Sequence, residues 1–452
     1  MALFKTQRSR QNLFVRHQVL MFSFVAFLIM VMLTPYLTIS ASGEAGEGSA
    51  LRQVFYFAVF GLLIFSVRPL GHPERLLVVP WPIVLAFAWC TITLLWSLDP
   101  GVGGRRLILT GIVIWSVFIA VRNQPFDDTI MLIRGVLLLM LVVNFIAVLR
   151  FPEFGTHQFN MEDDKQLVGD WRGVMMSKNI AGALCSVTVL FFLFGGGKVP
   201  IWLRVPVIAA SLVFLFFSQS KTSGIMMAGS ALIALLYNVF RWRYRSWVIA
   251  LLFLAFAGLA AFLSAYHHPL RDALDDPHAF TGRAQIWDAM LRYAADSHYV
   301  GAGFGSFWFT SNSPIFNYAH DWVATVTQGH SGYLDLLITV SPIGVVLIAF
   351  ALIIWPAQQL LRLPVGLSRE AALPLGVIFF CAGHNATETS MFDRDTLMNI
   401  FMLAAVAMIE QIMATRRERP NLSRGNNRRS AASPQPLSRP DEGSPMPGGA
   451  LW

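Results

Sequence analysis

Long apolar stretches alternate with short polar segments along most of the chain. A helix needs about 20 apolar residues to cross the hydrocarbon core of a bilayer, so the pattern predicts an all-α, polytopic membrane protein with about twelve transmembrane helices. The expected helices lie at residues 19–39, 53–67, 76–97, 106–121, 130–149, 174–194, 201–217, 223–240, 246–264, 331–355, 371–387 and 396–413.

The composition agrees with this class. Hydrophobic residues make up 55% of the 452 residues and charged residues only 13%, whereas soluble domains carry about 25% charged residues. All three cysteines, Cys90, Cys185 and Cys381, fall within predicted membrane helices. The sequence therefore predicts no disulfide framework.

The distribution of Lys and Arg predicts how the helices are oriented. With the N-terminus in the cytoplasm, most of the 34 Lys and Arg residues lie on the cytoplasmic side, as the positive-inside rule requires. The chain then divides into a basic cytoplasmic N-terminus at 1–18, a transmembrane domain at 19–413 and a disordered cytoplasmic tail at 414–452. This bias explains the net charge of +8 without a nucleic-acid partner, because a tail rich in Pro, Ser, Gly and Arg is typical of a solvated segment.

The polar excursions gather on the opposite face. In this topology the long loop 265–330 and the shorter segments 150–172, 218–222 and 388–395 all lie outside the cytoplasm. Most of the ten histidines lie there as well. Any chemistry is therefore expected at the outer face.

Arg283 begins a stretch in which apolar residues, Trp287 among them, recur with helical spacing. The pattern predicts an amphipathic helix lying on the outer leaflet within the long loop. A cation at a helix N-terminus opposes the helix dipole, so Arg283 needs a reason to be there. Two reasons stay open: Arg283 completes an anion site at the helix N-terminus, or it contacts lipid headgroups.

His330 lies at the start of the tenth predicted span, and Asp335 follows a little over one turn later. A nearby carboxylate can hold a histidine in one tautomer. His330 is a candidate general base for a sugar hydroxyl, with Asp335 as its partner. The alternative is a boundary histidine that only forms local hydrogen bonds.

Further polar residues mark the outer ends of other spans. Lys221 lies in a turn of hydroxyl and amide residues, where it either extends to the membrane surface or belongs to an inward polar site. The sixth predicted span is preceded by Arg172 and opened by Lys178 and Asn179, and charge entering a span suggests function. Glu388 marks another outer boundary.

Two kinds of chemistry receive no support from the sequence. Gly301, Gly303 and Gly305 resemble a phosphate-binding loop, but neither a strand nor a dinucleotide-type helix flanks them, so they predict a tight re-entrant turn. His267 and His268 are adjacent and lack the helical spacing of a metal site. Basic residues beside His330 instead suit a substrate that carries a pyrophosphate and a sugar.

The chain resembles the membrane O-antigen ligase/polymerase superfamily, and most closely its exopolysaccharide polymerase branch. The resemblance rests on five motifs, which are Trp171-Arg172-Gly173 with Lys178-Asn179, Ser218 to Thr222, Thr281-Gly282-Arg283 with Trp287, Gly301 to Trp308, and Gly329-His330 to Asp335 with Pro342-Ile343-Gly344. It covers roughly residues 165–345 and extends to the span count of the whole chain.

The resemblance implies a GT-C-like fold in the bacterial inner membrane, with both termini cytoplasmic and an active site at the periplasmic face. It implies an undecaprenyl-pyrophosphate-linked oligosaccharide as donor, a glycan acceptor, and no metal or nucleotide-sugar cofactor. Membrane lipids and other proteins of polysaccharide assembly and export are the remaining expected partners. By the same resemblance, Arg283 and Lys221 hold the pyrophosphate and His330 activates the acceptor hydroxyl.

Arg172, Lys178, Asn179, Trp287, Asp335 and Glu388 complete the expected substrate-binding set. Two departures from the family pattern stand out: Ser331 follows the histidine where Asn is frequent, and Lys221 stands where ligases often carry Arg. The Lys, together with Phe307 and Trp308 after the glycines, favours a polymerase.

Two alternatives remain. Besides a polymerase, the chain could be a ligase that transfers a glycan to lipid A-core, or a transporter or flippase for lipid-linked sugars. A transporter is expected to concentrate ionisable residues at the bilayer midplane, where Arg134 is nearly alone. Charge collects instead at one face, which favours the transferase.

Overall fold

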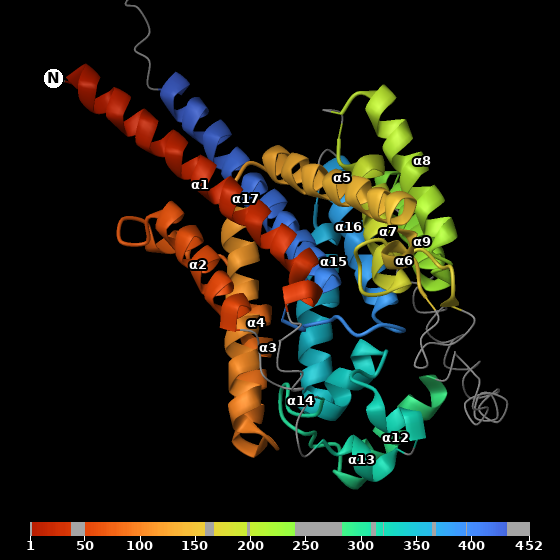
Figure 1. Cartoon of the computed structure of the whole chain (residues 1–452). Helices are drawn as coiled ribbons and strands as arrows, with labels where there is room; N and C mark the ends of the chain where they lie inside the picture. Colours follow the sequence, from red (N-terminus) through yellow and green to blue (C-terminus); the bar gives the residue numbers. More distant parts are fainter. Residues whose placement is uncertain are drawn as a thin grey trace, which may run out of the picture. The chain divides into compact units, whose positions relative to one another are not determined.

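The protein is described here by a computed structural model. The structure describes residues 2–37, 50–158, 167–196, 199–239, 283–308, 313–319, 321–363, 368–394 and 396–431. The predicted span 246–264, the loop residues 265–282 and the tail residues 432–452 lie outside the described residues. Within these ranges every regular element is a helix, and one isolated antiparallel bridge joins Thr156 to Trp171 (Figure 1).

The longer helices are α1 (Ala2–Leu37), α2 (Ala50–Val67), α3 (Trp81–Ile92), α4 (Pro100–Arg122), α5 (Phe126–Arg150), α7 (Lys178–Phe194), α8 (Ile201–Phe217), α9 (Lys221–Val239), α12 (Arg283–Asp296), α14 (Gly332–Ala349), α16 (Ser368–His384) and α17 (Leu397–Ala431). The short elements are η1 (Pro73–Arg75), η2 (Thr93–Trp96), α6 (Pro152–Gly155), α13 (Ile315–Tyr318), η6 (Asp321–Thr325), η7 (Phe350–Ile354) and α15 (Trp355–Leu361).

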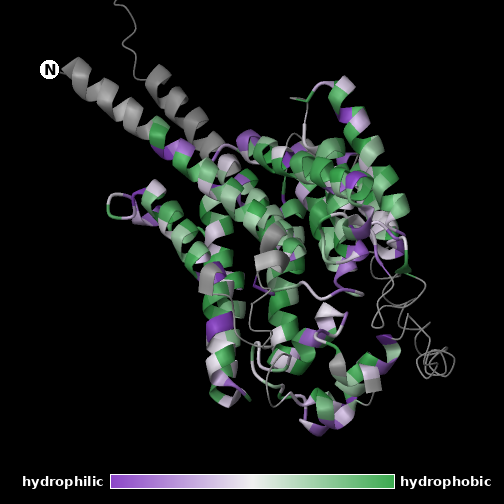
Figure 2. Cartoon of the chain, in the orientation of Figure 1, coloured by the Kyte–Doolittle hydropathy of each residue, from purple (hydrophilic) through white to green (hydrophobic). Residues whose placement is uncertain are grey.

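Each predicted span other than 246–264 overlaps a helix of the structure. In the described part of the chain, five helices are long and apolar enough to cross a membrane: Phe14–Met32, Pro100–Arg122, Phe126–Arg150, Gly332–Leu361 and Leu397–Thr415. Shorter apolar helices accompany them, and the hydrophobic residues run along both sets (Figure 2). The membrane class is confirmed, while the number of twelve spans stays a prediction.

The contacts divide the chain into two units, Met1–Ile412 and Met413–Trp452. Helix α17 continues to Ala431, so it extends beyond residue 413, where the sequence predicted the start of a disordered tail. The residues that follow the apolar part of α17 include Ala, Arg and Glu, which have high helix propensity.

Helix α14 is broken in the middle by Ser341 and Pro342. Ser341 has a φ of 70°, outside the helical region, and Pro342 has no N–H to donate to the carbonyl of Ile338. The loop of glycines after α12 supplies the missing donors. Ala302 donates its N–H to the Ile338 carbonyl at 2.8 Å, and Gly303 donates to Thr339 at 2.9 Å. The break in α14 therefore fixes the re-entrant turn that the sequence predicted.

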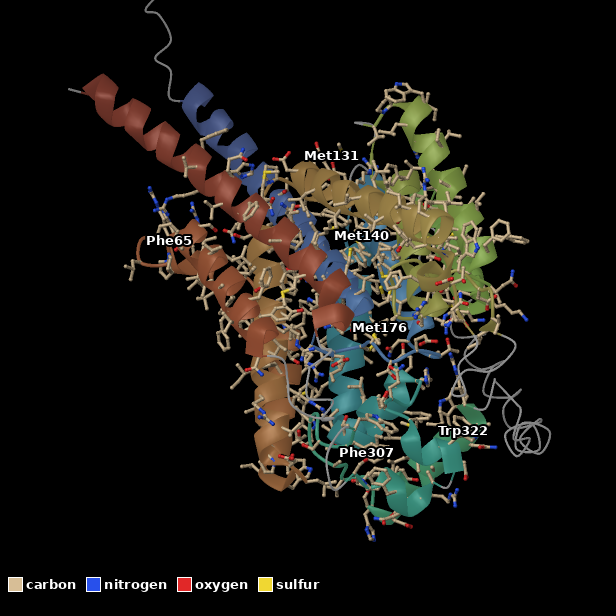
Figure 3. The ribbon with its side chains drawn as sticks, in the orientation of Figure 1. Phe65, Met131, Met140, Met176, Phe307 and Trp322 are labelled. Carbon is tan, nitrogen blue, oxygen red and sulfur yellow. The ribbon has the colours of Figure 1, made fainter. Side chains whose placement is uncertain are left out.

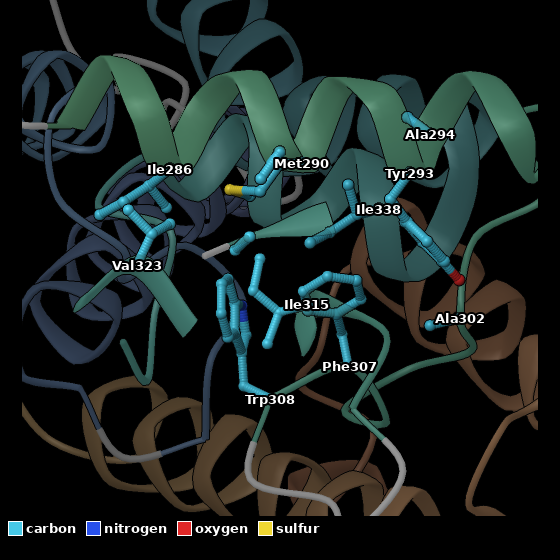
Figure 4. Packing of buried hydrophobic residues seen from close by; sticks show 12 residues of the cluster. Ile286, Met290, Tyr293, Ala294, Ala302, Phe307, Trp308, Ile315, Val323 and Ile338 are labelled. Atoms are coloured by element: carbon cyan, nitrogen blue, oxygen red, sulfur yellow. The ribbon is translucent and has the colours of Figure 1, made fainter. Parts of the chain in front are cut away.

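The amphipathic helix predicted from Arg283 onward is present as α12, but its apolar face packs on protein. Ile286, Met290 and Tyr293 are buried in a core cluster with Phe307 and Trp308 of the glycine loop (Figure 4), and Figure 3 labels Phe307 within the whole molecule. The expectation that this apolar face rests on lipid was therefore wrong, while the place of α12 relative to the outer leaflet stays a prediction. Hydrophobic periodicity shows that a face is covered, but it does not distinguish lipid from protein as the cover.

The backbone of Gly303 generates the first testable prediction. Gly303 has a φ of 85°, and a Cβ there would lie 2.5 Å from the Cα of Ser97. Gly303→Ala combines left-handed strain with overpacking and is expected to destabilise the protein by about 2–4 kcal/mol. Thermal unfolding of the detergent-purified variant measures the loss.

Gly169 provides the matched control. Its φ is 91°, but a Cβ there meets nothing within 4 Å. Gly169→Ala carries only the backbone cost of about 1 kcal/mol. Equal losses in the two variants would show that the close approach to Ser97 has no energetic weight.

Candidate functional site

The turn that follows α16 carries the central carboxylate of the polar region, Glu388. The side-chain oxygen of Asn385 accepts the backbone N–H groups of Ser390 at 2.9 Å and Met391 at 2.8 Å, which shapes the turn. The N–H of Gly332, the first residue of α14, donates to the carbonyls of Asn385 at 2.9 Å and Glu388 at 3.2 Å. The backbone of Glu388 is therefore tied to the start of α14.

The side chain of Glu388 gathers groups from three other segments. Its Oε1 accepts one hydrogen bond from Arg283 Nη2 and one from Asn179 Nδ2, each at 2.7 Å. Its Oε2 lies 3.7 Å from His330 Nδ1. We call these four residues, Arg283, Glu388, His330 and Asn179, the Glu388 cluster.

Burial and charge act in opposite directions on Glu388, whose side chain is only 13% exposed. Burial alone would raise the pKa of this carboxyl. The interaction with His330 and the positive charge of Arg283 outweigh burial and hold the pKa below its ordinary value. Glu388 is therefore an anion at neutral pH, and it compensates a buried cation.

Arg283 is the first residue of α12, and its side chain is 17% exposed. Besides the ion pair with Glu388, its Nη1 donates to the carbonyl of Thr387. The ion pair offsets the unfavourable position of a cation at a helix N-terminus. The anion that Arg283 holds in the structure is Glu388, and its expected contact with a pyrophosphate stays a prediction.

His330 occupies the short loop before α14 with a φ of 49°, in the left-handed region that non-glycine residues rarely adopt. The neighbouring Gly329 is held on both sides: its carbonyl accepts from Trp287 Nε1 at 2.9 Å, and its N–H donates to Asp335 at 3.3 Å. Trp287 therefore contributes by fixing the His330 loop. Strained residues that persist in this way often mark functional sites.

The sequence led us to expect that Asp335 orients His330, but in the structure Asp335 has other partners. Its buried carboxylate accepts from Trp308 Nε1 at 2.6 Å, from Thr389 Oγ1 and from the N–H of Gly329. In the part of the chain that the structure describes, the carboxylate facing His330 is Glu388. Helix α14 already begins at Gly332, and this start places Asp335 beneath the loop, where it supports Gly329.

The motif around Lys221 reaches the Glu388 cluster through its serines. Ser220 Oγ donates to Asn179 Oδ1 at 3.3 Å, and Ser223 Oγ approaches the carbonyl of Asn179 at 3.4 Å. Asn179 is thereby held in position to donate to Glu388. Lys221 itself is exposed at the first residue of α9, and in the described ranges its side chain has no ion-pair partner.

Lys178 and Arg172 are engaged elsewhere. Lys178 Nζ forms an ion pair with Asp170 at 2.6 Å. Arg172 Nε donates to the carbonyl of Phe154 at 3.2 Å, and its guanidinium lies over the Phe154 ring. Both side chains hold the loop before α7, so their expected contacts with substrate stay a prediction.

His384 is a polar residue whose position the sequence did not reveal. It is 3% exposed, stacks on Phe380, and neither ring nitrogen has a hydrogen-bond partner in the described ranges. The sequence placed Glu388 at an outer boundary and in the expected substrate-binding set, without linking it to His384. Their separation of four positions, at the end of a helix, was the one signal that they lie close together.

The comparison with protein families is consistent with this geometry. A family model described as O-antigen ligase matches residues 206–352, which include Lys221, Arg283 and His330. Asn179 and Glu388 lie outside the matched segment. No curated protein matches the chain. The chain is therefore similar to the O-antigen ligase family over its segment 206–352, which is about a third of its length.

Proposed function

We propose that the protein is a membrane glycosyltransferase that polymerises exopolysaccharide repeat units at the periplasmic face. Its donor is an undecaprenyl-pyrophosphate-linked oligosaccharide, its acceptor is the hydroxyl of a second glycan, and it uses no metal. The observation that supports the proposal best is the Glu388 cluster. In it a cation suited to pyrophosphate and a histidine suited to proton transfer lie on the two oxygens of one carboxylate.

The proposed reaction joins two sugars in one displacement. The acceptor oxygen attacks the anomeric carbon of the donor, and the bond from that carbon to the pyrophosphate oxygen breaks. His330 takes the proton of the hydroxyl on Nε2, because Nδ1 faces Glu388. Arg283, with Lys221, stabilises the charge that develops on the departing pyrophosphate. Glu388 stabilises the imidazolium that forms, in the role first expected of Asp335.

Transfer to lipid A-core is the second candidate. The cluster holds donor and base in the same way for either acceptor, and the match to the O-antigen ligase model favours this alternative. Deletion of the gene separates the two. Loss of glycan chain length indicates a polymerase, and loss of attachment to lipid A-core indicates a ligase.

The transporter alternative depends most on Arg134, and the structure gives this residue partners within the protein. Arg134 was the ionisable group nearest the midplane of the predicted spans, and its side chain donates to the carbonyls of Phe191 at 2.8 Å and Gly196 at 3.4 Å. These are carbonyls at and just beyond the C-terminal end of α7, where a cation is favourable. Arg134 therefore has a structural role that needs no transported substrate.

Arg283 is the first residue to test. Arg283→Lys keeps the charge but loses the forked hydrogen bonds, and a loss of about 1.5–3 kcal/mol predicts a roughly 10- to 150-fold fall in polymer synthesis. Arg283→Ala is expected to abolish synthesis. Arg292→Ala on the same helix is the control, because its ion pair with Asp288 is solvated, with side chains 58% and 60% exposed. Wild-type output from a well-expressed Arg283→Ala protein would remove Arg283 from the site.

His330 is tested by what accumulates. His330→Ala is expected to abolish transfer while donor still binds, so lipid-linked donor builds up in cells. His330→Gln should be no better, because an amide forms hydrogen bonds without accepting the proton. His298→Gln is the matched control, since His298 is exposed and has a similar φ of 51°. Near-normal polymer from His330→Gln would mean that His330 only positions the acceptor.

The periplasmic assignment depends on topology. The Lys and Arg bias predicts that a reporter active only outside the cytoplasm works when fused within 265–330. The same reporter should be silent when fused within 195–204 or 241–246. Fusion activity in whole cells measures this, and the reverse pattern would place the Glu388 cluster on the cytoplasmic side.

A further inference from the structure

One carboxylate serves two partners in the Glu388 cluster, and it serves them unequally. Oε1 is within hydrogen-bond distance of Arg283 and Asn179, both at 2.7 Å. Oε2 is 3.7 Å from His330 Nδ1, which is beyond a hydrogen bond. His330 Nδ1 is buried and has no hydrogen-bond partner in the described ranges. In this structure the Glu388 carboxylate is hydrogen-bonded to Arg283, and it is too far from His330 to accept the N–H that would orient the ring.

A pyrophosphate and Glu388 compete for Arg283. The guanidinium gives one nitrogen to Thr387 and another to the carboxylate, so an arriving anion meets a site that already holds a negative charge. Like charges in a partly buried site repel strongly. Release of Glu388 into a buried space without a new partner would be costly as well.

His330 is the partner that makes release favourable. A movement of about 1 Å brings Oε2 from its present distance to an ordinary N–H···O hydrogen bond. The two backbones are already tied together, since the N–H of Gly332, two residues after His330, donates to the Glu388 carbonyl. Asn179 is held in place by Ser220. Its side-chain amide is a neutral donor to Glu388, and it can keep this hydrogen bond while the carboxylate leaves Arg283.

We propose that a pyrophosphate displaces Glu388 from Arg283 and transfers the carboxylate to His330, so that the histidine is oriented as a base only when the donor is bound. The identity of the anion rests on the proposed function. The exchange makes Glu388 a positioning residue that competes with the donor, in contrast to the substrate-binding role expected from the sequence. It couples occupancy of the donor site to readiness of the base, with no change in the backbone.

The test measures binding of inorganic pyrophosphate and of a polyprenyl pyrophosphate to the full chain in lipid nanodiscs. Glu388→Gln removes the competing charge and keeps the shape, so it is expected to bind pyrophosphate about tenfold more tightly while losing polymer synthesis. Asp288→Asn is the matched control, since it removes a carboxylate from the solvated pair with Arg292 on the same helix. Its affinity should stay within about twofold of wild type.

A second arm reads the transfer to His330. If the released carboxylate moves there, His330→Ala weakens pyrophosphate binding in the wild-type background without abolishing it, and has no such effect in the Glu388→Gln background. This double-mutant cycle isolates the pair from the rest of the site. Should Glu388→Gln fail to accumulate, Glu388→Ala takes its place as the second background: an effect of His330→Ala confined to the wild-type background supports the exchange, and no effect or an equal effect overturns it.

The failures are distinguishable. If binding depends on Arg283 but Glu388→Gln binds no more tightly than wild type, the exchange is wrong and the proposed function stands. An equal effect of His330→Ala in both backgrounds has the same meaning. If neither wild type nor Glu388→Gln binds either pyrophosphate, or if Arg283→Ala binds like wild type, the donor assignment itself falls, and the exchange falls with it.

Discussion

The partly buried ion pair between Arg283 and Glu388 is the interaction on which the polar region depends. The two residues are 105 positions apart, and their contact joins the start of α12 to the turn after α16. Loss of either partner would leave a buried charge uncompensated, at a cost of about 3–5 kcal/mol. This penalty keeps both segments together. Asn179 and His330 are then arranged around a carboxylate whose position is already set.

The break in α14 makes the rest of this arrangement rigid. Pro342 and Ser341 free carbonyls in the middle of an apolar helix, and free carbonyls are not tolerated in lipid. Ala302 and Gly303 of the glycine loop satisfy two of them, and Trp89 Nε1 donates to the carbonyl of Val340 at 2.9 Å. The loop so fixed carries Trp308, which binds Asp335. Asp335, held by Trp308, accepts the N–H of Gly329 and so supports the strained backbone of the neighbouring His330.

The sequence predicted the helices well, because hydropathy is a local property, and it singled out Arg283 and His330 as candidates, which the structure places on either side of one carboxylate while their roles stay predictions. It could not predict their partner. Glu388 reaches them from a distant segment: α12 packs on α14, and hydrogen bonds of Gly332 and Tyr333 tie the start of α14 to the end of α16 and the turn after it. Asp335 was assigned to His330 from spacing alone. That inference failed because the Asp335 carboxylate accepts a hydrogen bond from Trp308, a residue of another loop.

The four cations that the sequence singled out differ in what their side chains contact. Arg283 is partly buried and geometrically fixed, so in the proposed reaction it supplies direction as well as charge. Lys178 and Arg172 are committed to the loop before α7. Lys221 is exposed at the N-terminus of α9, next to Ser220 and thus one contact from Asn179. An exposed point charge at a helix N-terminus attracts a diphosphate without prescribing its orientation. Orientation of the donor in the proposed reaction then depends on Arg283, whose guanidinium forms an ion pair with Glu388 in this structure.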